Sequence, residues 1–112
     1  MKWTLLETQQ QLEEIKSSTQ ISLIFKHSTR CSISMVVKKR FELDWEALPE
    51  NIDLYFLDLL RFREISNAIA EDFSVYHQSP QLLLIKDGEC IYETTHGEIS
   101  AEEAAEQISV SS

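Results

Sequence analysis

One cysteine of this chain stands where a thiol can do covalent chemistry. Cys31 follows a short polar stretch and precedes an apolar helical pattern, which predicts that it lies in the first turn of a helix. Free N–H groups and the dipole at a helix N-terminus stabilise a thiolate, and Arg30 adds a neighbouring positive charge. We therefore expect the Cys31 thiol to ionise below the ordinary cysteine pKa of about 8.5 and to attack disulfides.

Two hydroxyl residues flank this cysteine and bear on its chemistry. Thr29 carries a short polar side chain that can accept a hydrogen bond from the first free N–H groups of the helix. Ser34 stands three residues after Cys31, where a Cys-x-x-Cys pair would hold its second thiol. A hydroxyl cannot release a mixed disulfide by forming an internal bond, so the pattern predicts monothiol chemistry. The alternatives, a buried core cysteine and an ordinary polar helix residue, remain open on position alone.

Cys90 is the other thiol of the chain, and its predicted place is remote from Cys31. It begins a strand after a hairpin turn. If the preceding strand starts beside Cys31 and runs away for about five residues, the two cysteines are on the order of 17 Å apart. A disulfide needs Cα atoms within about 7 Å, so we expect Cys90 to be a structural strand residue, with a minor chance of being a reporter or damage site.

Three histidines are candidates for assisting a thiolate. His27 precedes Cys31 by four residues, His77 lies before Pro80, and His96 ends the last predicted strand. All three could lie on the Cys31 side of the sheet, where an imidazole can hold a thiolate or transfer a proton. Taken singly, each is more often a polar loop residue. No compact ligand spacing of the zinc-site kind is present, so no metal is predicted.

Hydrophobic patterning predicts the elements that must position these residues. They are, in order, a helix carrying Leu5, Leu6, Leu12 and Ile15 and ending near Ser17, a strand at Ile21 to Phe25, a helix from Cys31 through Phe41, a strand at Ile52 to Leu59, a helix carrying Ile65 to Phe73, strands at Leu82 to Ile85 and Cys90 to Tyr92, and a helix from Ser100 through Ile108. The strands joined by the Cys31 helix should be parallel with a right-handed crossover. The turn Asp87-Gly88 predicts an antiparallel hairpin. The prediction is an α/β fold with a four-stranded mixed sheet flanked by helices, in the order α-β-α-β-α-β-β-α.

Composition limits the classes of partner. The 112 residues, 43% of them hydrophobic, suit one domain over residues 1–112. Ten Lys and Arg against 19 Asp and Glu give a net charge of −9, which argues against nucleic-acid binding. No export signal and no apolar segment near the roughly 20 residues of a membrane span are present, so we expect a cytoplasmic protein with reduced thiols and no membrane partner.

The layout of the chain resembles the thioredoxin superfamily. The segments that carry the resemblance are Phe25-Lys26-His27-Ser28-Thr29-Arg30-Cys31-Ser32-Ile33-Ser34 and Ser79-Pro80-Gln81-Leu82-Leu83-Leu84-Ile85-Lys86-Asp87-Gly88-Glu89. The first looks like the Thr-Cys-Pro-Ile-Ser type site of the bacillithiol-system YtxJ-like proteins, the monothiol bacilliredoxins. His77-Gln78 before Ser79-Pro80, and His96, strengthen this likeness. The resemblance implies that Ser79-Pro80 is a cis bond that docks extended substrate backbone beside the reactive cysteine.

The same resemblance implies a function. Cys31 would remove low-molecular-weight thiols such as bacillithiol from protein mixed disulfides. Its partners would be thiolated proteins and a small thiol, with the small thiol as co-substrate and no bound cofactor.

The sequence departs from the family pattern at two positions. Arg30 stands where a threonine or similar residue is expected, and Ser32 replaces a proline whose fixed φ suits a helix start. The buried acidic residue that many dithiol thioredoxins carry before their site is missing, since the sequence around Phe25 is interpreted as apolar.

Two other functions are compatible with the residues. A noncatalytic thioredoxin-fold adaptor would bind partner segments against the Ser79-Pro80 loop and the hairpin, with an unreactive Cys31. An iron–sulfur monothiol glutaredoxin is disfavoured, because Ser-Ile-Ser follows Cys31 where such proteins show Gly-Phe-Ser. Alkylation of Cys31 across pH separates the adaptor from the oxidoreductase.

Overall fold

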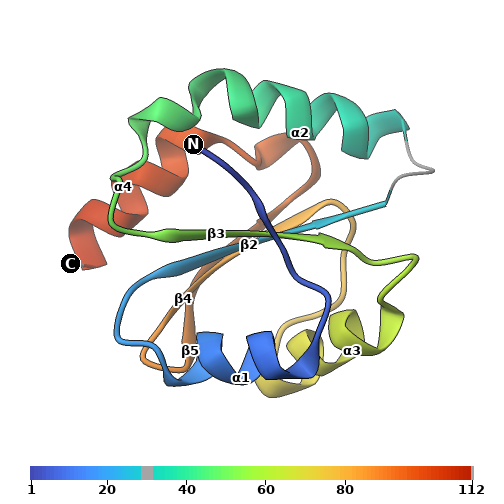
Figure 1. Ribbon diagram of the computed structural model, residues 1–112. Coiled ribbons are helices and arrows are strands. Elements are labelled where there is room, and N and C mark those ends of the chain that lie inside the picture. Colours follow the sequence, from blue (N-terminus) through green and yellow to red (C-terminus); the bar gives the residue numbers. More distant parts are fainter. Residues whose placement is uncertain (29–31, 112) are drawn as a thin grey trace.

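The computed structural model describes residues 1–28 and 32–111, in which a central sheet carries helices on both faces (Figure 1). The elements are β1 (Thr4–Leu5), α1 (Gln9–Ser17), β2 (Ser22–His27), α2 (Ser32–Asp44), the 3₁₀ turn η1 (Trp45–Ala47), β3 (Asp53–Asp58), α3 (Arg63–Asp72), β4 (Gln81–Lys86), β5 (Glu89–Thr95), the 3₁₀ turn η2 (His96–Glu98) and α4 (Ala101–Ser111). Helices α2 and α4 cover one face of the sheet, and α1 and α3 cover the other. None of the helices in these two ranges is both long and apolar enough to span a bilayer.

The sheet has the strand order β1-β3-β2-β4-β5. Strands β2 and β3 are parallel, whereas β4 is antiparallel to both β2 and β5. The mixed sheet, the parallel strands on either side of α2 and the antiparallel hairpin are therefore confirmed.

The N-terminal segment differs from the prediction, which assigned Leu5 and Leu6 to the first helix. Leu5 ends strand β1, which pairs in parallel with β3, and the amide of Leu6 donates to a β3 carbonyl at 2.9 Å. The helix begins only at Gln9, because Thr8 and Gln11 form a reciprocal capping box with both hydrogen bonds at 3.1 Å. The sheet of the described chain consequently has five strands instead of four.

Strand β2 is buried along its whole length, and its side chains alternate between the two core layers. Leu23 and Phe25 pack in the layer under α2 and α4, whereas Ile24 packs in the layer over α1 and α3. The alternation continues into polar residues at the end of the strand: Lys26 is 0% exposed and His27 is 4% exposed. The strand that leads toward Cys31 thus delivers one buried polar group to each face of the sheet.

A tight turn joins β4 to β5, as the Asp-Gly pair predicts. Asp87 has φ 53° and Gly88 has φ 79°, the two successive positive values of a type I′ turn. A Cβ atom at Gly88 would lie 2.9 Å from the carbonyl oxygen of Lys16, at the end of α1. The turn therefore needs glycine both for its backbone conformation and for close contact with α1.

We expect Gly88→Ala to lower the free energy of unfolding by about 1–2 kcal/mol from the left-handed backbone alone, with the contact to Lys16 adding to the loss. Gly97→Ala is the matched control, since a Cβ atom there meets nothing within 4 Å. Urea unfolding of both variants measures the difference. Equal losses in the two variants would contradict this account of the turn.

Candidate thiol site

The predicted thiol site lies where β2 passes to α2. Thr29, Arg30 and Cys31 are outside the described residues, so the site is built here from its flanks. His27 is the last residue of β2, and Cys31 directly precedes the first residue of α2 in the sequence. Ser34 lies in the first turn of α2 and is fully buried. The strand and the helix that frame the 29–31 segment are therefore the ones that the sequence predicts.

The segment containing Ser79-Pro80 lies at the same end of the sheet. The Ser79-Pro80 peptide bond is cis, as the resemblance implies. Gln81 follows it directly and pairs with Lys26, the residue before the end of β2. The backbone amide of His96 donates to the carbonyl of Pro80 at 3.1 Å. Antiparallel pairing of β2 with β4 thus brings the cis-proline loop and the turn carrying His96 to the end of the sheet from which the chain leads to Cys31.

His27, the last residue of β2, is buried and uncharged. Burial, followed by the positive charge of Lys38, lowers the pKa of His27 below its ordinary value, whereas Asp58 and a backbone hydrogen bond with Ser34 act in the opposite direction. The imidazole is consequently neutral near pH 7. Its Nδ1 atom has no hydrogen-bond partner among the described residues.

Two buried hydroxyls at the same end of the sheet share this lack of a partner. Within residues 1–28 and 32–111, neither Ser34 Oγ nor Ser79 Oγ has a hydrogen-bond partner. Most buried polar groups in proteins are paired, so unpaired ones call for an explanation. His27 Nδ1 and Ser34 Oγ lie on β2 and α2, the elements on either side of residues 29–31 in the sequence, and Ser79 Oγ lies in the loop that carries the cis bond.

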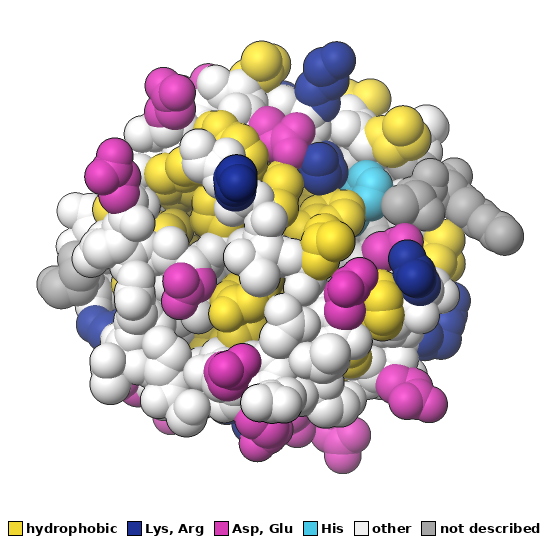
Figure 2. Space-filling view, viewed as in Figure 1, with side chains coloured by type: hydrophobic (Ala, Val, Ile, Leu, Met, Phe, Trp, Pro, Cys, Tyr) yellow, Lys and Arg dark blue, Asp and Glu magenta, His cyan; other side chains and the backbone are white. Residues whose placement is uncertain are grey.

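A groove opens beside His27 on the face formed by α2 and the β1–β3 edge. Its volume is about 560 Å³. The residues that line it are Trp3, Leu5, His27, Met35, Lys38, Lys39, Glu42 and Phe56. Figure 2 shows hydrophobic side chains gathered on this face with charged groups among them. A slightly larger hollow, about 630 Å³, is lined by Ile21, Ile52 and Lys86 among others, at the end of β2 opposite His27.

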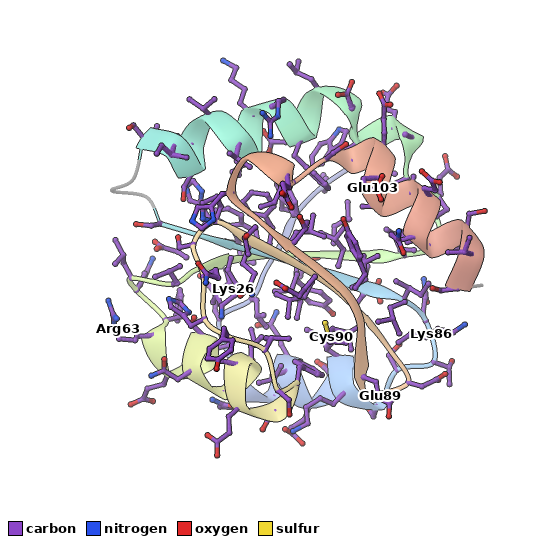
Figure 3. The ribbon with its side chains drawn as sticks, turned by 180° about the vertical axis from the view of Figure 1, so that it is seen from behind. Lys26, Arg63, Lys86, Glu89, Cys90 and Glu103 are labelled. Carbon is purple, nitrogen blue, oxygen red and sulfur yellow. The ribbon has the colours of Figure 1, made fainter. Side chains whose placement is uncertain are left out.

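Cys90 lies far from His27 along the sheet. It pairs with Ile85 of β4, which pairs in turn with Ser22 at the start of β2, whereas His27 ends β2. Figure 3 shows Cys90 and Lys26 well separated along the sheet. Burial raises the pKa of the Cys90 thiol, which keeps it protonated at neutral pH. Cys90 is half-buried in a strand, in agreement with the structural role predicted for it.

The sequence interpretation missed Lys26. The sequence around Phe25 predicts an apolar strand, but Lys26 is fully buried within it, on the face opposite His27. Its Nζ atom lies 3.2 Å from Nδ1 of His77 and donates to the backbone carbonyl of Ser66 at 3.3 Å. The available signal was a charged residue within a strand buried on both faces, since buried lysines are rare unless they are paired.

Comparison with known proteins identifies the family. Residues 4–104 match the family model described as monothiol bacilliredoxin BrxC. The chain belongs to the monothiol bacilliredoxin family. This bacilliredoxin resembles a solved structure described as having a thioredoxin fold and a suggested oxidoreductase role, at 27% identity and a TM-score of 0.81 over 93% of this chain and 91% of that chain.

Two solved thioredoxins are similar in fold. A mutant thioredoxin from Halobacterium salinarum NRC-1 has 17% identity and a TM-score of 0.73, covering 97% of the bacilliredoxin and 89% of its own chain. The thioredoxin of Malassezia sympodialis has 13% identity and a TM-score of 0.71, with 98% and 89% covered. These likenesses show the fold alone. Family and fold together make this bacilliredoxin a thiol oxidoreductase.

The neutral state of His27 leads to a pH-dependent stability. Its folded-state pKa is lowered, so the stability it contributes is present above its ordinary pKa of 6.5 and is lost as the pH falls through the folded value. We expect His27→Gln to make unfolding free energy less dependent on pH between about pH 7.5 and pH 5.5. Urea unfolding at several pH values measures the two slopes, and an unchanged slope in the variant would contradict a buried neutral imidazole.

Proposed function

We propose that this bacilliredoxin uses Cys31 as its nucleophile to remove bacillithiol, or a similar small thiol, from protein mixed disulfides. The observation that carries the proposal is the family match across residues 4–104, a range in which Cys31 and Cys90 are the two thiols. Cys90 is half-buried with a raised pKa, which leaves Cys31 as the candidate nucleophile.

The proposed step is a thiol–disulfide exchange. The Cys31 thiolate attacks the bacillithiol sulfur of the mixed disulfide, a new S–S bond forms to Cys31, and the bond to the substrate protein breaks. The protein thiolate leaves and takes a proton from water. A second thiol, from outside the protein, then attacks the bacillithiol sulfur of the Cys31 disulfide, forms a new S–S bond to it and releases the Cys31 thiolate. The disulfide substrate is reduced, and the outside thiol supplies the electrons.

Release of the small thiol depends on that outside reductant. Ser34 occupies the position of a second thiol and is buried, so its hydroxyl offers neither a sulfur nor an accessible nucleophile. Cys90 pairs near the opposite end of the sheet from Lys26 and His27. A monothiol cycle, in which the Cys31 mixed disulfide persists until another thiol arrives, is the chemistry compatible with both residues.

In this proposal the substrate protein binds at the cis-proline loop. Pro80 precedes β4, whose pairing with β2 puts the loop beside the strand leading to Cys31. An extended substrate segment would lie along this edge, where main-chain groups give affinity independently of sequence. Docking that does not depend on the substrate's sequence suits a protein that acts on many thiolated partners in a reducing, cytoplasmic setting.

Exposure to bacillithiol disulfide followed by intact mass measurement tests the proposal. We expect the wild type and Cys90→Ser to gain one bacillithiol each, and Cys31→Ser to gain none, because the Cys90 thiol is protonated and half-buried. In a separate assay that starts from the reduced proteins, the first two, but not Cys31→Ser, should remove bacillithiol from a thiolated substrate protein. Modification of Cys90 in place of Cys31, or equal release by Cys31→Ser, would refute the proposed mechanism. An unmodified wild type would favour the noncatalytic adaptor.

A further inference from the structure

A buried polar cluster lies beneath the cis-proline loop and has no part in the exchange step. Lys26, from β2, and Ser66, from α3, are both 0% exposed. Lys26 Nζ lies 3.2 Å from His77 Nδ1, and Ser66 Oγ also lies 3.2 Å from that nitrogen. Among the described residues no carboxylate forms an ion pair with Lys26. Burying a lysine ammonium without a counter-ion costs free energy, so the contact between Lys26 and the imidazole of His77 requires an explanation.

The contacts determine which nitrogen of His77 carries the proton. An ammonium group has donors and no acceptor, so the imidazole nitrogen that it contacts must present a lone pair. Nδ1 of His77 is therefore unprotonated, and the ring proton lies on Nε2. Burial, and then the charges of Lys26 and Arg63, lower the pKa of His77, which agrees with a neutral ring. Burial lowers the pKa of Lys26 to about 8, so the ammonium form still prevails near pH 7.

Because these contacts occupy the Nδ1 side of the ring, Nε2 of His77 faces the outside of the protein. His77 is exposed, whereas Lys26 and Ser66 are completely buried and take up the Nδ1 side of the ring. Within the described chain, His77 Nε2 makes no hydrogen bond. Figure 3 shows Lys26 at the end of the sheet near the start of α3, where Arg63 lies.

The loop that carries His77 is fixed at three points. Lys26 holds the ring of His77, and Gln81 Nε2 donates to the carbonyl of Tyr76 at 2.9 Å and to the Glu93 carboxylate at 3.0 Å. At the other end of the loop, the Pro80 carbonyl accepts from the η2 backbone. His77 is thus held rigidly, three residues before the cis-proline at the proposed docking edge.

We propose that Lys26 is a positioning residue that fixes His77 as an Nε2–H donor, and that this donor binds an acceptor oxygen of the disulfide substrate. The oxygen belongs either to a peptide carbonyl of the protein substrate or to a carboxylate or carbonyl of the small thiol. This inference rests on the proposed function for the identity of the substrate. The state of the His77 ring does not depend on it.

The first experiment measures which nitrogen of the His77 ring is protonated. Nitrogen NMR of the wild type near pH 7 is expected to show an unprotonated Nδ1 and a protonated Nε2 at His77. Lys26→Met removes the ammonium at similar length and should give a mixture of tautomers. Lys86→Met is the matched control, since Lys86 donates to Ser111 near the other end of the sheet and should leave the His77 signals unchanged. A wild type protonated at Nδ1 would overturn the proposal.

The second experiment measures substrate affinity. His77→Phe should raise KM roughly tenfold, the value of about one hydrogen bond, with kcat nearly unchanged. Lys26→Met should raise KM by a smaller factor, because a mixture of tautomers keeps part of the Nε2–H donor. The double variant should be no worse than His77→Phe, because both changes act on the same donor. His77→Phe alters an exposed side chain and so keeps the test open if Lys26→Met fails to fold.

Two substrates separate the sources of the oxygen. A KM increase with a thiolated protein alone assigns the oxygen to the peptide, whereas an increase with bacillithiol disulfide as well assigns it to the small thiol. An active wild type whose KM is unchanged by His77→Phe for both substrates would overturn the inference and leave the proposed function standing. An inactive wild type refutes the proposed function. In that case the proposal survives only if adding either disulfide to Cys31→Ser shifts the His77 Nε2 signal.

Discussion

The antiparallel pairing of β2 with β4 is the constraint on which the candidate site depends. The pair Lys26–Gln81 aligns the end of the strand that leads to Cys31 with the start of the strand that follows the cis Ser79-Pro80 bond. A slip of one residue in this register would exchange the faces to which Lys26 and His27 point. The packed layers on both faces of the sheet make that slip costly, so the core itself sets the geometry around the thiol segment.

Much of the fold follows from short sequence signals. The continuous apolar run of β2 predicts a strand covered on both faces, and Asp87-Gly88 predicts the hairpin turn with its two positive φ values. The two-residue strand β1 was missed, because Leu5 and Leu6 also fit the spacing of an amphipathic helix. The capping box that begins at Thr8 was the signal that placed the helix start later.

The site was harder to predict than the fold. Cys31 and the Ser79-Pro80 loop could be singled out by residue type and spacing, although the placement of Cys31 lies outside the described residues. The role of Lys26 could not be predicted, because its imidazole partner His77 is 51 positions away and becomes its neighbour only through folding. The burial of His27 could not be predicted either, because it depends on the layer of residues that covers this face of the sheet. Chemistry-bearing residues can thus be recognised from sequence, but their protonation states depend on long-range packing.

This bacilliredoxin is a thiol oxidoreductase of a monothiol family, whose members act without an internal resolving thiol. Buried polar residues lie on both faces of β2 and in the cis-proline loop, at the end of the sheet from which the sequence continues to Cys31. The pH dependence of Cys31 alkylation in a Cys90→Ser variant tests the central claim most directly. We expect a reaction midpoint well below the free-cysteine pKa of about 8.5, and a midpoint at or above that value would contradict a helix-stabilised thiolate at Cys31.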